Sequence, residues 1–222
     1  MERSYRYIDI ISALFVTVLL VSNIASVKIL DFGPFSFDGG TILFPLSYIF
    51  GDLITEVYGY QRSRRIFWIG FVSAVLMSFT FYFVGFLPSS KEWLLQDQYM
   101  NILGVTWRIV VASLIAYFAG EFSNSYVLAK MKVWMKGEYM WIRLVLSTVV
   151  GEFFDTLLFV LIAFYGTLPN DLIMTIIVSN YIFKVGFEFV FSPVTLKVIS
   201  FLKKKENEDY YDRKTDFNPF IV

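Results

Sequence analysis

Long runs of apolar residues, separated by short polar segments, make up most of this chain. A helix that crosses the hydrocarbon core of a bilayer needs about 20 mostly apolar residues. Six segments fit this requirement, and we expect each to form one span: Ile8–Ile29, Thr41–Tyr58, Ile66–Leu87, Trp107–Ala129, Trp141–Tyr165 and Leu172–Phe201. The pattern predicts an all-α membrane protein, a bundle of six transmembrane helices.

Polar and turn-forming residues mark the edges of this bundle. Pro45, near the start of the second span, and Pro193, late in the sixth, predict kinks or short re-entrant pieces. The stretch Phe32–Gly40 is typical of a turn-rich loop. After residue 202 the chain becomes polar with charges of both signs. We therefore expect a transmembrane domain of residues 1–202 and a solvated or disordered cytoplasmic tail of residues 203–222.

Basic residues alternate between the predicted loops and set the orientation. They precede the first span and follow the second, fourth and sixth, at Arg3, Arg6, Arg62, Arg64, Arg65, Lys130, Lys132, Lys136, Arg143, Lys203, Lys204 and Lys205. Loops rich in lysine and arginine stay on the cytoplasmic side of a membrane. Both termini of this multi-pass cell membrane protein are therefore predicted to be cytoplasmic. We expect the three arginines after the second span to contact lipid headgroups.

The amino-acid composition excludes several classes of function. Hydrophobic residues make up 57% of the chain and charged residues 17%, an apolar share too large for a soluble domain of 222 residues to cover. The net charge is zero, so nothing indicates a nucleic-acid partner. The chain has no cysteine and no histidine, which removes thiol chemistry and the commonest metal ligand. We expect no metal, no cofactor and no enzymatic activity.

Carboxylates inside the predicted spans are the main candidates for function, because a charge is costly to bury in a membrane. Lys184 is the one clearly buried cation beside six acids: Asp52, Glu56, Glu121, Glu152, Asp155 and Glu188. Two close carboxyl groups share protons and titrate as a pair, which is a basis for coupling transport to protons. Glycine precedes an acid at Gly51, Gly120 and Gly151, and glycine allows helices to approach closely.

Structural interpretations of the same residues remain open. Asp52 and Glu56 are within reach of Arg62 or Arg64 if they lie near the cytoplasmic interface. Lys184 and Glu188 are four residues apart, a spacing typical of an ion pair on one helix. The polar side chains Ser22, Ser26, Thr55 and Asn124 are suited to hydrogen bonds between helices.

Five motifs over Ser22–Phe191 make the chain similar to the queuosine precursor transporter family, within a wider group of vitamin-uptake-like membrane proteins. They are "SNIASVK", "FPLSYIFGDLITEVYG", "RSRR", "GEFSNSYVLAKMK" and "RLVLSTVVGEFFDTLLF". The resemblance implies a six-helix bundle like the substrate-binding subunits of energy-coupling-factor transporters. It also implies import of 7-cyano- or 7-aminomethyl-7-deazaguanine, or of queuine or queuosine, and leaves the choice among them open.

A deazaguanine suits the buried polar residues. Its N1–H and exocyclic amine can donate together to one carboxylate, its carbonyl can accept from Asn or Lys, and its flat ring can stack on an aromatic side chain. Carried onto this sequence, the resemblance gives these substrate-binding candidates: Asn23, Asp52, Glu56, Glu121, Asn124, Glu152, Asp155 and Lys184.

The alternative is a substrate-capture subunit that needs a separate ATP-driven coupling complex. Such subunits often carry an Ala-x-x-x-Ala docking motif in the first span, where this chain has only Ala13-x-x-x-Thr17 and similar pairs. We therefore do not expect a coupling ATPase. A homodimer is compatible with the sequence, which leaves the oligomeric state and the energy source open.

Overall fold

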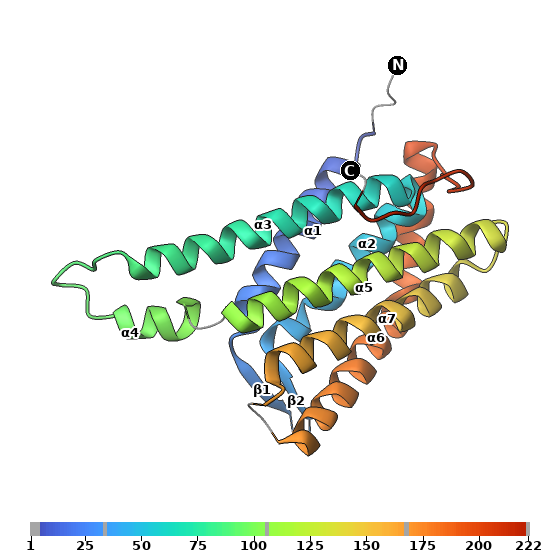
Figure 1. Ribbon diagram of the computed structural model, residues 1–222. Helices are drawn as coiled ribbons and strands as arrows, with labels where there is room; N and C mark the ends of the chain where they lie inside the picture. Colours follow the sequence, from blue (N-terminus) through green and yellow to red (C-terminus); the bar gives the residue numbers. More distant parts are fainter. Residues whose placement is uncertain (1–4, 33–34, 105–106, 167–168, 221–222) are drawn as a thin grey trace.

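Each of the six apolar segments contains a helix in the computed structural model, which describes residues 5–32, 35–104, 107–166 and 169–220. Figure 1 shows how these helices form a bundle. They are α1 (Ile8–Ala25), α2 (Phe44–Tyr58), α3 (Tyr60–Phe86), α5 (Trp107–Trp134), α6 (Met140–Phe164) and α7 (Asn170–Glu206).

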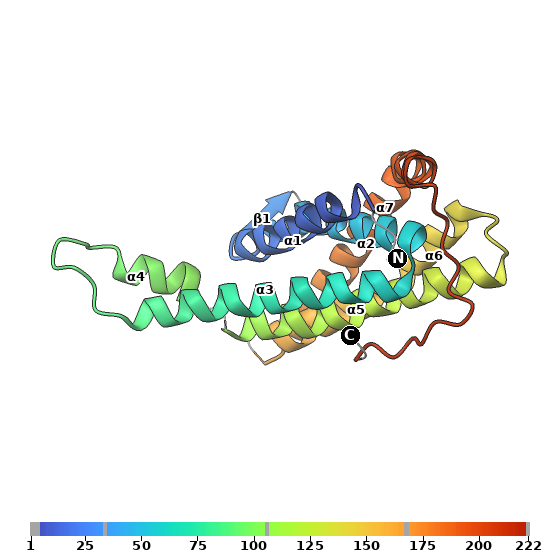
Figure 2. The ribbon, with the colours of Figure 1, turned by 90° about the horizontal axis from the view of Figure 1, so that it is seen from above.

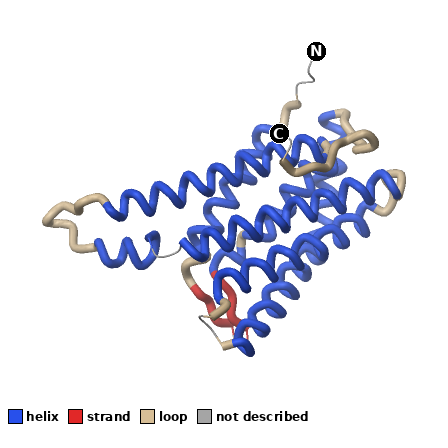
Figure 3. The backbone as a smooth tube through the Cα atoms, viewed as in Figure 1, coloured by secondary structure: helices blue, strands red, loops and turns tan. Residues whose placement is uncertain are grey.

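Short elements fill two of the connections. Between α1 and α2 lie an antiparallel hairpin and one 3-10 turn, where the sequence indicated only a loop (Figure 3): β1 (Ile29–Phe32), β2 (Phe35–Asp38) and η1 (Gly39–Ile42). The connection after α3 contains α4 (Gln96–Tyr99) and a π-helical turn, η2 (Met100–Gly104). This connection projects with the end of α3 beyond the other helices (Figures 1 and 2).

Four of the described helices are long and apolar enough to cross a membrane: α1, α3, α6 and α7. The 15 residues of α2 make a helix of about 22 Å, shorter than the hydrocarbon core of about 30 Å. The 28-residue helix α5 is long enough but carries a polar stretch over residues 121–125. The chain is a multi-pass membrane protein, and the count of six spans stays a prediction.

Helix α2 is central, with α1, α3, α5 and α7 all packed against it. Its residues 51–58 are all buried. Pro45 lies in the first turn of α2, where a proline is tolerated without a kink, and the alternative of a short re-entrant piece stays a prediction. Helix α7 continues through Pro193, which cannot donate to the carbonyl oxygen of Phe189. The hydroxyl of Ser192 donates to that oxygen instead, at 2.8 Å.

The segment after α7 is ordered and contacts the bundle, whereas the assignment of residues 203–222 as a cytoplasmic tail stays a prediction. The carboxylate of Asp212 accepts the backbone N–H of Tyr60, with distances of 3.2 and 3.1 Å to its two oxygens. Trp68 donates to the carbonyl oxygen of Pro219 at 2.7 Å. The ring of Tyr210 covers Gly59, whose φ of +90° and lack of a side chain allow the tight α2–α3 connection. Polar composition did not reveal these contacts, because many of them use backbone atoms.

One arginine of the α2–α3 connection differs from its predicted role. Arg64 is only 3% exposed, and its guanidinium donates to the carbonyl oxygens of Asp216 and Asn218 at 2.8 and 2.6 Å. It therefore binds the C-terminal segment instead of a lipid headgroup.

The two described ends of the chain lie at the same end of the bundle (Figure 1). The hydroxyl of Tyr5 donates to the carboxylate of Glu208 at 2.8 Å. We call this the terminal end and the opposite one the hairpin end. The placement of the terminal end in the cytoplasm stays a prediction.

Candidate functional site

Two glycines bring α5 and α6 into close contact. A Cβ atom on Gly120 would overlap the hydroxyl of Tyr48 and lie 2.7 Å from Cβ of Asp155. A Cβ atom on Gly151 would lie 2.7 Å from Cβ of Asn124. The contact is reciprocal, since each glycine faces the polar residue four positions after the other glycine. Close approach at the glycine–acid pattern was predicted, and the structure confirms it for this helix pair.

Polar side chains beside this contact pair with the neighbouring helices. Asn124 of α5 donates to Oδ1 of Asp52 in α2 at 2.7 Å. Lys184 of α7 places its Nζ 2.5 Å from Oδ2 of Asp155 and 3.1 Å from Oε2 of Glu152, both in α6. All five side chains are less than 9% exposed. The paired groups thus join α2, α5, α6 and α7 in the interior of the bundle.

Two buried carboxyl groups have no such partner. Glu121 is fully buried and Glu188 is 1% exposed, and none of their four oxygens has a hydrogen-bond partner among the described residues. The sequence suggested an ion pair between Lys184 and Glu188, but Lys184 extends across the helix contact to Asp155. That interpretation was wrong. An isolated carboxyl group in the interior is costly, which makes both side chains functional candidates.

The unsatisfied atoms around these carboxyl groups are mostly hydrogen-bond acceptors. Other carboxylate and amide oxygens without a hydrogen-bond partner among the described residues are Oδ2 of Asp52, Oδ1 of Asn124, Oδ1 of Asn180 and Oε2 of Glu152, the last of which has an ion pair with Lys184. The hydroxyls of Tyr48, Tyr117, Thr148 and Thr156 are also unsatisfied, and these can donate or accept. The described interior therefore has a shortage of donors, which a donor-rich ligand would correct.

A small cavity lies beside Lys184, toward the hairpin end. It has a volume of about 20 Å³ and is lined by Ser26, Thr41, Phe44, Ser113, Asp155, Phe159 and Lys184. The Nζ atom of Lys184 is 4.7 Å from the centre of the Phe44 ring. Such a volume holds about one water molecule, whereas ligand pockets are typically about 300–1,000 Å³. A base-sized ligand therefore requires the helices to move apart.

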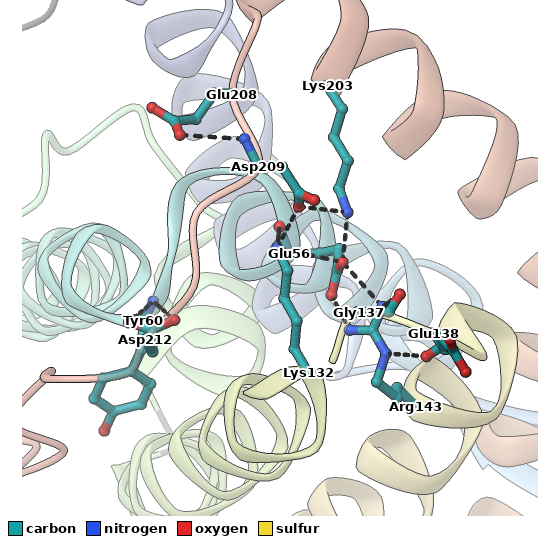
Figure 4. Close-up of polar contacts among 10 residues, drawn as sticks. All are labelled: Glu56, Tyr60, Lys132, Gly137, Glu138, Arg143, Lys203, Glu208, Asp209 and Asp212. Carbon is teal, nitrogen blue, oxygen red and sulfur yellow. Dashed lines mark hydrogen bonds and ion pairs between the residues drawn. The ribbon is translucent and has the colours of Figure 1, made fainter. Parts of the chain in front are cut away.

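A second ion cluster, centred on the buried Glu56, lies at the terminal end (Figure 4). Arg143 donates to both oxygens of Glu56 at 2.5 and 3.1 Å, Lys203 donates to one of them at 2.7 Å, and Lys132 lies 3.5 Å away. Asp209 bridges the two lysines at 2.6 and 2.8 Å. Burial alone would raise the pKa of Asp209, but the two lysines outweigh it and lower that pKa. Cations of α5, α6 and α7 thus hold Glu56, rather than the arginines of α3.

Asn23 lies away from the carboxyl groups. Its amide nitrogen donates to the carbonyl oxygen of Leu19 at 2.8 Å, and its amide oxygen accepts from the hydroxyl of Ser113 at 2.6 Å. This second bond links α1 to α5. Asn23 also lines an apolar groove of about 520 Å³ between α1, α3, η2 and α5. Ser113, which donates to Asn23, also lines the small cavity.

The structure brings six of the eight predicted binding residues together in the interior: Asp52, Glu121, Asn124, Glu152, Asp155 and Lys184. Asn23 and Glu56 lie apart, and the part in binding predicted for all eight stays a prediction. The predicted set of binding residues left out Glu188 and Tyr48. The spacing of Glu188 on its helix was visible in the sequence, whereas nothing there distinguished Tyr48 from the many other aromatic residues. Among the described residues, no group of three acids is arranged to hold a metal ion.

Comparisons with known proteins agree on one family. The sequence profile of a family described as "Putative vitamin uptake transporter" matches residues 38–198. A "Probable queuosine precursor transporter" of Bacillus subtilis is 27% identical over 176 residues, which are 78% of this chain and 76% of the relative. The "Queuosine precursor transporter" of Escherichia coli is 28% identical over 156 residues, 68% of this chain and 67% of that protein. No solved structure matches the chain.

Proposed function

Because this chain belongs to the queuosine precursor transporters, within the vitamin uptake transporter family, we propose that it imports a 7-deazaguanine across the cell membrane. The family is one of transporters rather than enzymes. The candidate substrates are 7-cyano- and 7-aminomethyl-7-deazaguanine, followed by queuine and queuosine.

The shortage of donors in the interior is the observation that carries this proposal. A 7-deazaguanine presents an N1–H and an exocyclic amine on one edge, and these two donors match the two oxygens of a carboxylate. Glu121 suits this role, since both of its oxygens are buried and unsatisfied. Its Oε2 faces Gly51 of α2, where a Cβ atom would lie only 2.7 Å away. Glycine at this position allows the carboxylate to pack directly against the backbone of α2.

Proton coupling is a further part of the proposal. The carboxyl groups of Asp52, Glu121, Glu152 and Asp155 lie close enough for their charges to interact. Lys184 lies within ion-pair distance of two of them, Glu152 and Asp155. Neighbouring carboxyl groups exchange protons as a unit, so substrate binding at one changes the proton occupancy of the others.

We also propose that the protein works without a coupling ATPase, because the first span lacks the strict Ala-x-x-x-Ala motif. The test is uptake of 7-cyano-7-deazaguanine into proteoliposomes that contain only this protein, with and without a proton gradient. Accumulation driven by the gradient is the expected result. Binding without accumulation until a coupling complex is added would instead identify a capture subunit.

The same assay tests the role of Glu121. In Glu121→Gln the shape is kept but the second acceptor becomes a donor, so one ligand hydrogen bond is lost. A hydrogen bond to a charged group contributes about 1.5–3 kcal/mol, which corresponds to roughly tenfold or greater weakening. Glu92→Gln, an exposed change in the α3–α4 connection, is the control that should transport like the parent. Parent-like uptake by Glu121→Gln would exclude Glu121 from the site.

A further inference from the structure

We propose that Glu188 of α7 makes the site selective for an amine-bearing substrate by binding the ammonium group of its 7-substituent. This inference rests on the proposed function and goes beyond it. It names the side chain that distinguishes a cationic 7-deazaguanine, such as the aminomethyl compound, from a neutral one, such as the cyano compound.

Two contacts between α6 and α7 fix the position of Glu188. Lys184, one turn before it, reaches Glu152 of α6, and Ser192, one turn after it, accepts the indole N–H of Trp141 at 3.0 Å. Since the helices are antiparallel, Glu188 lies between these contacts on the face of α7 that meets α6. Its exposure of 1% agrees with this placement. Glu188 therefore faces the interior, one turn from Lys184 toward the terminal end.

The surroundings of Glu188 are rich in carboxyl groups. Its carboxyl group lies close enough to Asp52 and Glu152 for their charges to interact. Lys184 is within ion-pair distance of both Asp155 and Glu152, and it is not within that distance of Glu188. Among the described residues, no cation and no donor reaches either oxygen of Glu188.

Glu56 shows how this chain pairs another buried carboxylate. It is equally buried, and it is surrounded by Arg143, Lys132 and Lys203. The fold thus supplies three cations to the carboxylate of Glu56. Among residues 5–32, 35–104, 107–166 and 169–220 none pairs with Glu188, which supports a partner from outside the chain.

The aminomethyl and cyano substituents differ in how well they can bind to the carboxyl group of Glu188. A primary ammonium group carries a positive charge and three donors, so it satisfies the oxygens of Glu188 and favours the ionised form of this carboxyl group. A cyano group has no donor and only a weakly accepting nitrogen, which carboxylates do not bind. The aminomethyl compound should therefore bind more tightly than the cyano compound.

The test is equilibrium binding of both compounds to the purified full chain in detergent. The parent should prefer the aminomethyl compound. Glu188→Gln should weaken binding of that compound at least about tenfold, or about 1.4 kcal/mol, and leave binding of the cyano compound within about twofold. Glu188→Asp, which keeps the charge, should retain part of the preference, and the exposed change Glu92→Gln should retain all of it.

Thermal unfolding separates this role from a structural one. Glu188→Gln replaces a buried carboxyl group without a partner by an amide of the same shape, so its unfolding temperature should be no lower than that of the parent. Equal weakening for both compounds, no weakening, or a parent that prefers the cyano compound would overturn the assignment of Glu188 while the transport function stands. A parent that binds neither compound would overturn the proposed function, and this inference with it.

Discussion

A single methyl group added at Gly120 should disrupt the contact between α5 and α6. In Gly120→Ala the new Cβ would lie 2.7 Å from Cβ of Asp155, whereas ordinary contact begins at 3.4 Å, and it would also overlap the hydroxyl of Tyr48. The helices must therefore separate by about 0.7 Å at this point. Overpacking of this kind costs about 1–3 kcal/mol. In a chain of this length that lowers the unfolding temperature by roughly 2–12 °C.

The matched control is Gly186→Ala in α7, because nothing lies within 4 Å of a Cβ at Gly186. Alanine forms helix more readily than glycine by about 1 kcal/mol, so this variant should be as stable as the parent or more stable. Both variants are measured by thermal unfolding in detergent, with ligand binding as a second readout. If Gly120→Ala is as stable as Gly186→Ala and binds ligand equally well, the close α5–α6 contact is not a feature of the protein.

Three further predictions concern charges and topology. Lys184→Met leaves the carboxylates of α6 without their cation, and removal of one partner from a buried pair costs about 3–5 kcal/mol of folding free energy. The unfolding temperature should recover in the double variant Lys184→Met, Asp155→Asn. No recovery would contradict the pairing. Because the pKa of Asp209 is lowered in the folded chain, its ion pairs stabilise docking of the C-terminal segment at pH values above the unfolded-state pKa, and this stabilisation is lost as the pH falls through the folded-state pKa. Asp209→Asn should therefore expose this segment to proteolysis already at pH 7. Protection equal to that of the parent would exclude the contact. The chain has no cysteine, so single cysteines report topology: Asn170→Cys should react with an impermeant reagent outside sealed cells and Lys204→Cys should not, and the reverse result would invert the orientation.

The positions of the helices could be predicted from the sequence because length and apolar character are direct requirements of a bilayer. Their ends could not, since local contacts set them. Helix α7 extends to Glu206, beyond the predicted end of its span, and that residue accepts the backbone N–H groups of Arg6 and Tyr7 at 3.1 and 2.7 Å. The packing of residues 207–220 depends on contacts with distant helices, which composition does not encode.

The candidate site was predictable in its residue types but not in its partners. Buried acids stood out because each is costly in a membrane. Which cation each acid meets depends on the rotation of each helix about its own axis, and a single sequence does not give this rotation. Lys184 therefore bonds across to α6 instead of along α7, and Glu56 meets cations of three other helices instead of the nearby arginines.

The glycine contact between α5 and α6 also has a mechanical consequence. With no side chains between the backbones, Gly151 is a natural pivot for α6, and the two ion clusters lie on opposite sides of it. At 1.5 Å of rise per residue, Arg143 lies about 12 Å from the pivot and Asp155 about 6 Å. A tilt of about 10° would move Arg143 by roughly 2 Å one way and Asp155 by roughly 1 Å the other way. Opening of the ion pair at one end of the bundle and tightening at the other would then be a single motion of one rigid helix.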